Sequence, residues 1–318
     1  METVQLTIER FDGVTSYTQK YDIPYSPGKT ILSHLFYIKE NCDPTLNFTA
    51  SCRSAICGAC AVRVNGNAFL ACDTRMEKMV QLFKTKELTI APLGNFKVIS
   101  DLVVDWDDKI ERLKITKPTI QPKKEFTQET GCKQSPADFN KIAVQWDCIL
   151  CGICASECTA LTIDSNSFLE PFTFVQAERN AVDSRSMDPM YHGTPALQHG
   201  LWNCVRCFQC LKCPKDIRPA GRISSLRGVT MKHGVKNNLG ARHAYAFLTD
   251  LRHGGRLNET KLLLRTEGIV VMKRTALAIR LLLHGKVNPF ELFHQAKITG
   301  YVPLAHIVKD AMQKEGVK

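Results

Sequence analysis

Twelve of the fourteen cysteines in this 318-residue chain fall into three short stretches whose spacing suits metal chemistry. The first set is Cys52, Cys57, Cys60 and Cys72; the second is Cys148, Cys151, Cys154 and Cys158; the third is Cys204, Cys207, Cys210 and Cys213. Thiols separated by two residues bind a metal ion or an iron–sulfur cluster more readily than they form a disulfide network. Cys42 and Cys132 stand apart, and we expect each to be a free buried thiol.

The first set places three thiols on one loop, and the fourth follows after eleven residues. This is the plant-type arrangement for a [2Fe–2S] cluster, in which each iron takes two thiolates. Zinc sites usually pair two short knuckles, so zinc and purely structural thiols are the weaker alternatives. Gly58 is expected to let the backbone pass close to the cluster and point N–H groups at its sulfurs.

The second stretch has the C-x2-C-x2-C-x3-C spacing of bacterial ferredoxins, in which the fourth thiol serves a different cluster from the first three. The third stretch has a thiol at every third position and ends in Pro214, whereas Thr159 follows the second stretch where proline is usual. Two such runs predict an exchange of their last cysteines. One [4Fe–4S] cluster is therefore expected on Cys148, Cys151, Cys154 and Cys213, and the other cluster on Cys158, Cys204, Cys207 and Cys210.

The elements that must position the first set are strands around one helix. Alternating apolar residues predict strands at 4–9 and 16–23, and apolar residues at helical spacing predict a helix over 26–40. Residues 61–72 predict a hairpin with Asn65 and Gly66 as its two-residue turn, and 87–92 predict a further strand. This pattern indicates a small β-grasp domain of the plant-type ferredoxin kind, which we place at residues 1–105.

Residues 106–135 are charged and irregular, which predicts a linker, and strand signals stop there. Helices are expected at 135–145, 170–184 and 194–204, and in the C-terminal part at 239–255 and 288–300. Asn288 can cap the last helix, with Pro289 in its first turn and Glu291 completing a capping box. The predicted fold class is thus α+β: the β-grasp domain and linker, then an all-α bacterial-type ferredoxin domain at 136–235 and a basic helical C-terminal extension at 236–318.

The net charge of +11 lies entirely in the C-terminal third, because residues 216–318 carry 18 lysines and arginines against 7 acidic residues. A basic segment suits nucleic acid, anionic lipid or an acidic protein. The N-terminal residues include early acids and no apolar run, so we expect no signal peptide. The most apolar stretch, 268–285, is interrupted by Lys273, Arg274 and Arg280, so we expect no membrane-spanning helix.

Several further segments occur in a fixed order along residues 1 to about 230: "YIKENCDPTLNFTASCRSAICGAC", "ISDLVVDW", "KQSPADF", "CILCGIC" and "FLEPFTFVQAERNAVDSR". With the cysteine sets they resemble the iron–sulfur subunit of the succinate dehydrogenase/fumarate reductase (complex II) family. The resemblance implies a FAD-containing partner subunit that interconverts succinate and fumarate. It also implies that this chain carries electrons between that flavin and a quinone-side site. The sequence itself shows no flavin-binding glycine loop and no catalytic carboxylate pair, so no catalytic residue is expected.

The chain departs from the usual family pattern in three places. Ordinary members hold a [3Fe–4S] cluster through a C-x5-C-x3-C-P run. In this chain Cys207 adds a fourth thiol to that run, which predicts a second [4Fe–4S] cluster. The alternative is a [3Fe–4S] cluster that Cys207 does not ligate. Ile163 and Val205 stand where the family has a tryptophan and a histidine of its quinone pocket. About a hundred residues follow the last cysteine. These features resemble a subgroup whose partner is a cysteine-rich, heterodisulfide-reductase-like subunit in place of membrane-spanning anchors.

The resemblance also implies a complex held peripherally at the cytoplasmic membrane. We expect the complex at the cytoplasmic face; a complex at the periplasmic face would be exported by a partner's twin-arginine signal. The direction of the reaction and the kind of quinone stay open. A stand-alone ferredoxin-like or heterodisulfide-reductase-type electron carrier is the alternative function, which the complete plant-type domain disfavours. A metal-stabilised nucleic-acid-binding protein is suggested only by the basic tail, so no nucleic acid partner is expected.

Overall fold

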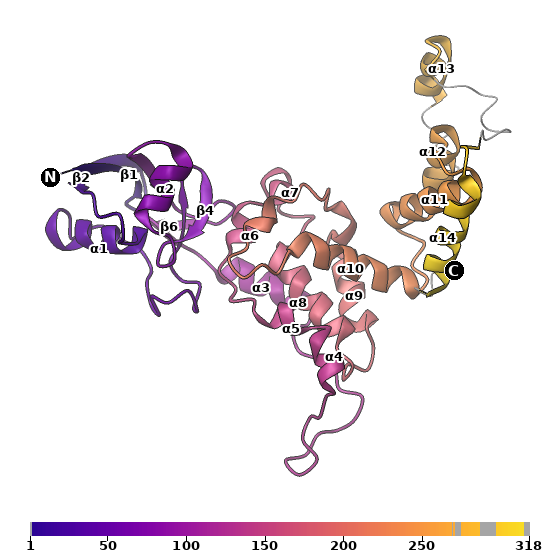
Figure 1. The fold of residues 1–318 in the computed structure, drawn as a ribbon, viewed down its shortest axis with the longest axis horizontal. Helices are drawn as coiled ribbons and strands as arrows, with labels where there is room; N and C mark the ends of the chain where they lie inside the picture. Colours follow the sequence, from indigo (N-terminus) through magenta and orange to yellow (C-terminus); the bar gives the residue numbers. More distant parts are fainter. Residues whose placement is uncertain (1, 269, 271–274, 287–296, 315–318) are drawn as a thin grey trace. The chain divides into compact units, whose positions relative to one another are not determined.

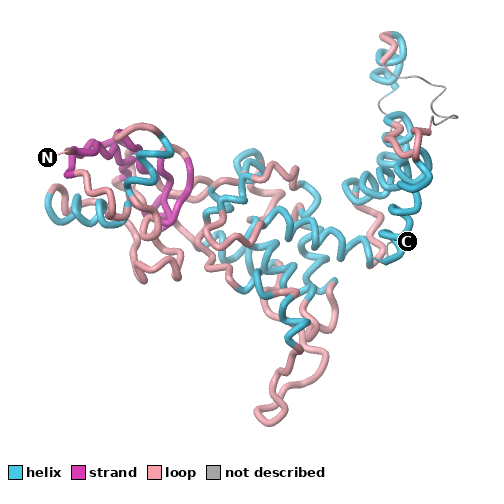
Figure 2. The backbone as a smooth tube through the Cα atoms, in the orientation of Figure 1, coloured by secondary structure: helices cyan, strands magenta, loops and turns pink. Residues whose placement is uncertain are grey.

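The structure is a computed structural model that describes residues 2–268, 270, 275–286 and 297–314 (Figure 1). The chain forms two compact units, Met1–Leu226 and Arg227–Lys318. The first unit begins with a mixed sheet and continues as a helical region, which confirms the expected fold class (Figure 2). The described residues of the second unit are mostly helical, and the boundary at Arg227 falls within one helix, α10 Pro219–Lys232.

The sheet has five strands in the order β2-β1-β5-β3-β4. Their bounds are β1 Thr3–Phe11, β2 Ser16–Pro24, β3 Ala61–Val64, β4 Asn67–Leu70 and β5 Glu87–Ala91. Strand β1 runs antiparallel to β2 and parallel to β5, and β3 runs antiparallel to β4 and β5. Asn65 and Gly66 form the turn of the β3–β4 hairpin, as expected, and both have positive φ. A separate two-stranded ladder joins β6 Val98–Ser100 to β7 Val103–Val104.

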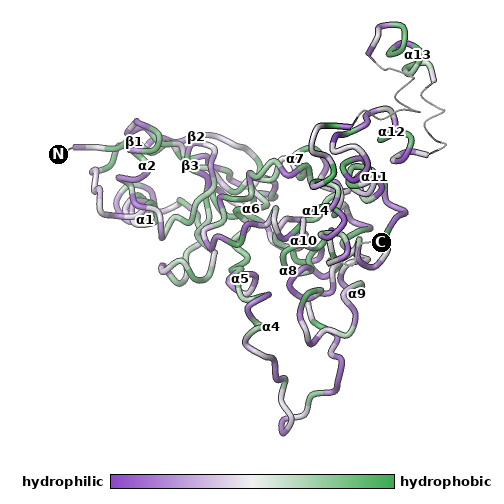
Figure 3. Tube along the Cα trace, turned by 45° about the vertical axis from the view of Figure 1, so that its right-hand side comes forward, coloured by the Kyte–Doolittle hydropathy of each residue, from purple (hydrophilic) through white to green (hydrophobic). Residues whose placement is uncertain are grey.

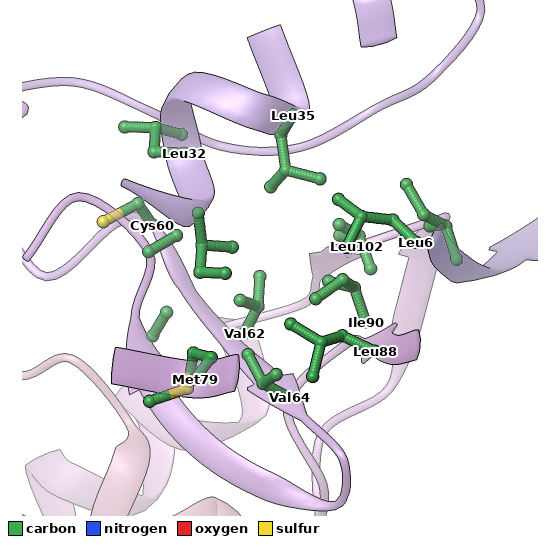
Figure 4. Packing of buried hydrophobic residues seen from close by; sticks show 14 of the residues in the cluster. Leu6, Leu32, Leu35, Cys60, Val62, Val64, Met79, Leu88, Ile90 and Leu102 are labelled. Carbon is green, nitrogen blue, oxygen red and sulfur yellow. The ribbon is translucent and has the colours of Figure 1, made fainter. Parts of the chain in front are cut away.

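Helix α1, Ile31–Asn41, packs its apolar face on this sheet, and Thr30 caps its first turn through a hydrogen bond from the Ser33 N–H. Figure 4 shows Leu32 and Leu35 above a layer of strand side chains. That layer includes Leu6, Val62, Val64, Leu88 and Ile90, all almost completely buried. A second helix, α2 Met76–Phe83, was not expected from the sequence. It has only eight residues and no capping side chain, and it is held by the burial of Met76 and Met79.

A buried arginine ties the loops at one end of the sheet together. Arg10 is 4% exposed and donates to Asp101 (Nε–Oδ1, 2.8 Å) and to Asp43 (Nη1–Oδ2, 2.6 Å). Asp101 also accepts from the backbone N–H of Asn47 at 2.8 Å. Hydrogen bonds from Thr45 first, and then from Tyr21 and Arg10, hold the pKa of Asp43 well below its ordinary value. The network therefore fixes the turn before the first cysteine loop and the β6–β7 segment to strand β1.

The segment expected to be an irregular linker begins with a helix, α3 Asp107–Ile115. Acidic residues in its first turn and basic residues in its last turn suit the helix dipole. Lys109 and Arg112 face inward and pair with the fully buried carboxylate of Glu170 at 3.1 and 2.8 Å. The charges that suggested a solvated linker are thus partly an internal ion-pair cluster. Residues 117–134 have no regular element beyond a bridge between Pro122 and Ser186.

The helical region is built from several short helices and two longer ones. They are α4 Pro136–Asn140, α5 Ala143–Trp146, α6 Ile153–Ser156, α7 Thr159–Ile163, α8 Pro171–Val182, α9 Met190–Gln198, α10 Pro219–Lys232, and two 3-10 turns at Leu201–Asn203 and Gln209–Lys212. The predicted helix at 170–184 is confirmed as α8, and ten of its twelve residues are buried. The helix expected at 135–145 breaks into α4 and α5, and α9 starts before residue 194.

In the second unit, α11 Leu239–Gly254 is confirmed where a helix was expected, with Asn238 as its cap. It packs with α12 Glu259–Glu267 and α14 Tyr301–Lys314, and the buried Asp250 of α11 pairs with Arg265 of α12. Helix α13 Thr275–Leu283 has no buried residue. The helix expected at 288–300 lies largely outside the described residues. Hydrophobic colour comes in short stretches in Figure 3, and within the described residues no helix has the length and apolarity to cross a membrane.

Candidate iron–sulfur cluster sites

The first cysteine set lies on the loop before β3 and just after β4. Backbone N–H groups of Ser54, Ile56 and Cys57 lie 3.4, 3.3 and 3.2 Å from the Cys52 sulfur. The N–H of Ala55 points at the Cys72 sulfur at 3.3 Å, and that of Cys72 at the Cys60 sulfur at 3.4 Å. The donors to the Cys52 sulfur favour its thiolate, and the first of them, Ser54, contributes most to lowering the pKa of Cys52 to about 6, whereas burial raises the pKa of Cys60 to about 12.

The loop turns its N–H groups inward because two of its non-glycine residues adopt positive φ, Arg53 at 54° and Ala55 at 56°. Successive N–H groups in such a conformation form a concave site that favours negative charge. Arg53 is held over the ring of Phe36, with its guanidinium carbon 4.4 Å from the centroid. The loop is therefore shaped around an anionic centre formed by its own sulfurs.

The structure gathers the second group from two distant parts of the chain. Cys148, Cys151, Cys154 and Cys213 line one cavity, together with Phe172 and Val175 of α8. Burial raises the pKa of Cys151 to about 12, and it raises that of the wholly buried Cys154 well above its ordinary value. Cys213 reaches this cavity from the third run, whereas Cys158 of the second run does not line it.

Cys158 lies instead at a second cavity with Cys204, Cys207 and Cys210, closed by side chains that include Phe168, Pro171, Ala220 and Ile223. Burial raises the pKa of Cys210 to about 11. Cys158 and Cys210 are buried, Cys204 is intermediate and Cys207 is exposed. The Thr159 hydroxyl lies 3.9 Å from the Cys207 sulfur, within the range of a sulfur hydrogen bond. The residue that replaces the usual proline thus contacts the additional thiol.

The chemistry of these cavities suits a cationic group bound by thiolates. Four thiols line each apolar pocket, and burial raises the pKa of Cys151, Cys154, Cys158 and Cys210, so the deprotonation of these thiols requires a positive charge inside the pocket. Within the described residues, no three histidine, cysteine, aspartate or glutamate side chains are arranged to hold a single metal ion. After the exchange of Cys158 and Cys213 between the two runs, four thiols line each of the two cavities, as a [4Fe–4S] cluster requires. The residues therefore fit iron–sulfur clusters.

The loops of the first and second sets touch at Gly58. A Cβ atom added there would lie 2.9 Å from Cα and Cβ of Cys151 and from the carbonyl oxygen of Ile149. The sequence suggested that Gly58 lets the backbone approach a cluster; in the structure it also lets one cysteine loop approach another. Gly152 is similarly enclosed, by Phe96, Trp106 and Leu93. Neither contact is visible from spacing, because each depends on how the sheet domain sits against the helical region.

Polar residues outside the cysteine runs hold the same loops, and sequence reasoning missed them. The Asn95 amide donates to the carbonyl oxygens of Ala155 at 2.8 Å and Cys158 at 3.1 Å, and it accepts from the Thr162 hydroxyl at 3.0 Å. The Gly94 N–H donates to Ser156 at 2.9 Å. The sequence analysis did not single out Gly94 or Asn95, because a Gly-Asn pair indicates at most a turn and gives no indication of the distant backbone that it bonds.

Four residues singled out in the sequence have surface positions. Ile163 and Val205 are 81% and 74% exposed. Cys42 and Cys132 are free but exposed, so the expectation of buried thiols was wrong for both. Cys42 falls just past the end of α1, and Cys132 lies in the irregular segment, where the Arg185 guanidinium approaches its sulfur at 3.5 Å. Hydrophobic character alone does not bury a thiol that no element covers.

Fold and sites together define an iron–sulfur protein with a plant-type ferredoxin domain followed by a helical two-cluster domain. Two family models match accordingly: a 2Fe-2S iron-sulfur cluster binding domain at residues 5–111 and a 4Fe-4S dicluster domain at 145–217. A solved structure, the Mycobacterium smegmatis Sdh1 complex in the apo form, shares the fold with a TM-score of 0.66. That match has 21% identity and covers 74% of this chain and 98% of that chain.

Curated relatives identify the family more specifically than the domain models do. The 8-methylmenaquinol:fumarate reductase iron-sulfur subunit of Wolinella succinogenes is 49% identical over 313 residues, which is 97% of this chain and 98% of the relative. The fumarate reductase iron-sulfur subunit of Mycobacterium tuberculosis is 33% identical over 224 residues, covering 70% and 89%. This chain belongs to the iron–sulfur subunits of the fumarate reductase/succinate dehydrogenase family. It is an electron-transfer subunit with [2Fe–2S] and [4Fe–4S] clusters, and such subunits work with a flavoprotein and a membrane anchor.

The Gly58 contact gives a prediction. Gly58→Ala forces the two cysteine loops apart, and we expect a loss of about 1–3 kcal/mol from overpacking beyond the backbone strain at φ +76°. Gly66→Ala is the matched control, because Gly66 has φ +79° but nothing within 4 Å. Thermal bleaching of the cluster absorbance, with iron and sulfide per chain, measures the difference. Equal bleaching temperatures for the two variants would contradict the contact.

Proposed function

We propose that this chain is the iron–sulfur subunit of an enzyme that reduces fumarate with electrons from a menaquinol-type quinol. The observation that carries this proposal is the near-full-length similarity to the Wolinella succinogenes subunit. That similarity extends through the basic C-terminal third, whereas the Mycobacterium tuberculosis relative matches 70% of this chain. The fumarate-reducing direction, which the sequence left open, follows from the activity in that relative's name.

The proposed ligand sets are those predicted from the spacing. They are Cys52, Cys57, Cys60 and Cys72 for [2Fe–2S]; Cys148, Cys151, Cys154 and Cys213 for [4Fe–4S]; and Cys158, Cys204, Cys207 and Cys210 for a second [4Fe–4S] cluster. The way the last two groups line separate cavities supports this division. When bound, the clusters supply one-electron oxidation and reduction, and the protein supplies their positions and surroundings.

We propose that the electron path runs through the cluster of Cys148, Cys151, Cys154 and Cys213. Gly58 brings the first loop against Cys151 of the second set. Cys158 and Cys213 exchange between the second and third runs and so keep those two sets adjacent. We propose that the sheet domain faces the FAD-containing subunit and that the third set faces the quinone side. Electrons for fumarate reduction then pass from the third set to the first.

Cys57→Ser tests this function. We expect quinol-linked fumarate reduction by the purified complex to be abolished, because the relay is cut next to the flavin. The signals of the other two clusters should persist in electron paramagnetic resonance spectra. Quinol-linked turnover that survives in the absence of the first cluster would refute the proposed order.

The third cluster is proposed to contain four irons, with Cys207 as a ligand. Cys207 lines the same cavity as Cys158, Cys204 and Cys210, and the Thr159 hydroxyl lies 3.9 Å from its sulfur. A thiolate within reach of a vacant iron site normally binds it. The alternative [3Fe–4S] cluster leaves Cys207 as an exposed free thiol.

The variant Cys207→Ala distinguishes a [4Fe–4S] cluster ligated by Cys207 from a [3Fe–4S] cluster. We expect the oxidised wild type, prepared without oxygen, to lack the isotropic resonance of a [3Fe–4S] centre, and the variant to acquire it as one iron is lost. Iron analysis should fall by one atom per chain. An intense [3Fe–4S] resonance in the wild type would refute ligation by Cys207.

The quinone-side partner is proposed to be a cysteine-rich, heterodisulfide-reductase-like subunit, with the quinone bound at its interface. Ile163 and Val205 are exposed and apolar, so they offer a dry contact surface and no side-chain donor for a quinone oxygen. We propose peripheral attachment at the cytoplasmic membrane. The cytoplasmic face is favoured, and the periplasmic face requires a partner's twin-arginine signal.

The extension at 236–318 is proposed to dock a partner subunit or the membrane surface. Its α13 exposes large apolar side chains, among them Leu277, Ile279 and Leu283 at 51%, 55% and 80%. Apolar residues beside an excess of basic charge suit burial against an acidic surface. The proposed division of the chain is the plant-type ferredoxin domain at 1–105, the linker at 106–135, the helical ferredoxin domain at 136–235 and the C-terminal extension at 236–318.

Truncation after Val235 leaves α10 whole and tests the docking role. We expect all three clusters to persist while the complex dissociates or leaves the membrane, measured by co-purification and membrane fractionation. Joint loss of clusters and solubility would show that the extension only covers the helical region. Normal assembly and turnover would refute both roles.

A further inference from the structure

An ion pair between the second and third cysteine runs reaches the edge of the sheet domain. Lys212 donates to the carboxylate of Glu157 and to the Asn67 side-chain oxygen, the latter at 2.7 Å. The other Glu157 oxygen accepts from the backbone N–H of Ala68 at 3.0 Å. Asn67 and Ala68 open strand β4, which is an edge of the five-stranded sheet. We call the four residues Asn67, Ala68, Glu157 and Lys212 the inter-run clamp.

The clamp touches a loop of every cysteine set. Glu157 immediately precedes Cys158 and follows Cys154 by three residues, so it borders thiols of both cavities. Lys212 sits between Cys210 and Cys213, which also line different cavities. Strand β4 leads directly to Cys72 of the first set.

Burial makes this pair sensitive to the loss of either partner. The Glu157 side chain is 6% exposed, and its two oxygens are used by Lys212 and Ala68. The Lys212 side chain is 35% exposed, so water reaches the ammonium side. Removal of Lys212 alone leaves a nearly buried carboxylate without its counter-charge, which is strongly unfavourable. The carboxylate is then expected to move toward water and to release the β4 backbone.

We propose that Glu157 and Lys212 are positioning residues that fix the spacing between the [2Fe–2S] loop and the loops of the other two sets. This inference rests on the ligand sets proposed above. Electron transfer slows steeply as the distance between donor and acceptor grows, so a displacement of about 1 Å at this junction matters although no residue of the pair is a ligand. The pair adds to the Gly58 contact a second, electrostatic link across the same junction.

The test compares variants in the assembled complex. Lys212→Met keeps the side-chain length and removes the charge, Lys212→Arg restores the charge, and the double variant Glu157→Gln/Lys212→Met removes both charges. Lys215→Met is the matched control, since it removes a cation at the cavity of Cys148, Cys151, Cys154 and Cys213 that takes no part in the clamp. The primary readout is the magnetic coupling between the reduced first and second clusters, measured by pulsed electron paramagnetic resonance. The secondary readout is the rate of electron transfer between them.

We expect Lys212→Met to keep its iron content, to weaken the magnetic coupling and to slow the transfer several-fold. Lys212→Arg should restore both quantities, and the double variant should lie closer to wild type than Lys212→Met because no charge is left unpaired. Lys215→Met should leave the magnetic coupling unchanged. Where Lys212→Met fails to assemble, Glu157→Gln, which keeps an acceptor for Ala68, is expected to show the same weakening to a smaller degree.

Unchanged coupling and rate in a fully loaded Lys212→Met complex would overturn the proposal, as would an equal loss of coupling in Lys215→Met. Hydrogen exchange of the Ala68 amide provides a readout that needs no cluster. Faster exchange in Lys212→Met than in Lys215→Met supports the clamp, and equal exchange overturns it. A wild-type complex lacking the three cluster signals would instead refute the ligand sets, which distinguishes that failure from failure of the clamp.

Discussion

The constraint on which the whole first unit depends is the convergence of buried thiols from distant parts of the chain. Cys213 must reach the cavity of the second run, and Cys158 must reach that of the third. Each buried thiol resists ionisation, so its neighbours must be rigid enough to present it to an incoming cation without rearranging. The short helices α5, α6 and α7 serve this need, since each turns the chain within a few residues, and α8 supplies the long apolar wall that both cavities share.

Buried ion pairs mark the places where this scaffold is joined. Arg10 fastens the loops at one end of the sheet, Glu170 anchors α3 to the start of α8, and Glu157 joins two cysteine runs to an edge strand. In each case a charged side chain connects segments that are far apart in sequence, and each carboxylate has more than one donor. Such pairs add little net stability compared with apolar packing, but they are strongly directional. The ion pairs therefore determine which segments contact each other, whereas burial of the apolar core supplies the free energy of folding.

The sequence pattern alone was enough to predict the elements whose conformation depends on residues close together in the chain. Alternation located β1 and β2, helical spacing located α1, and the Asn65-Gly66 pair located the hairpin turn. Cysteine spacing alone indicated which thiols share a cavity. The sequence did not reveal α2 and α3, because their helical character depends on Met79 and Lys109 being buried by other segments. Nor did it reveal the partners of Asn95 or Glu157, because a polar residue carries no sign of the distant backbone it will bond. Contacts across the junction of sheet and helices are properties of the assembled fold.

Helix α10 has a consequence for where this chain tolerates insertions. Its first turns contribute Ala220 and Ile223 to the cavity of Cys158, Cys204, Cys207 and Cys210. Insertion of one residue between these two positions would turn one of them away from the cavity by about a hundred degrees relative to the other. An insertion after Lys232, the last residue of the helix, would leave both in place. Related subunits are therefore expected to vary in length beyond this helix more readily than within its first turns.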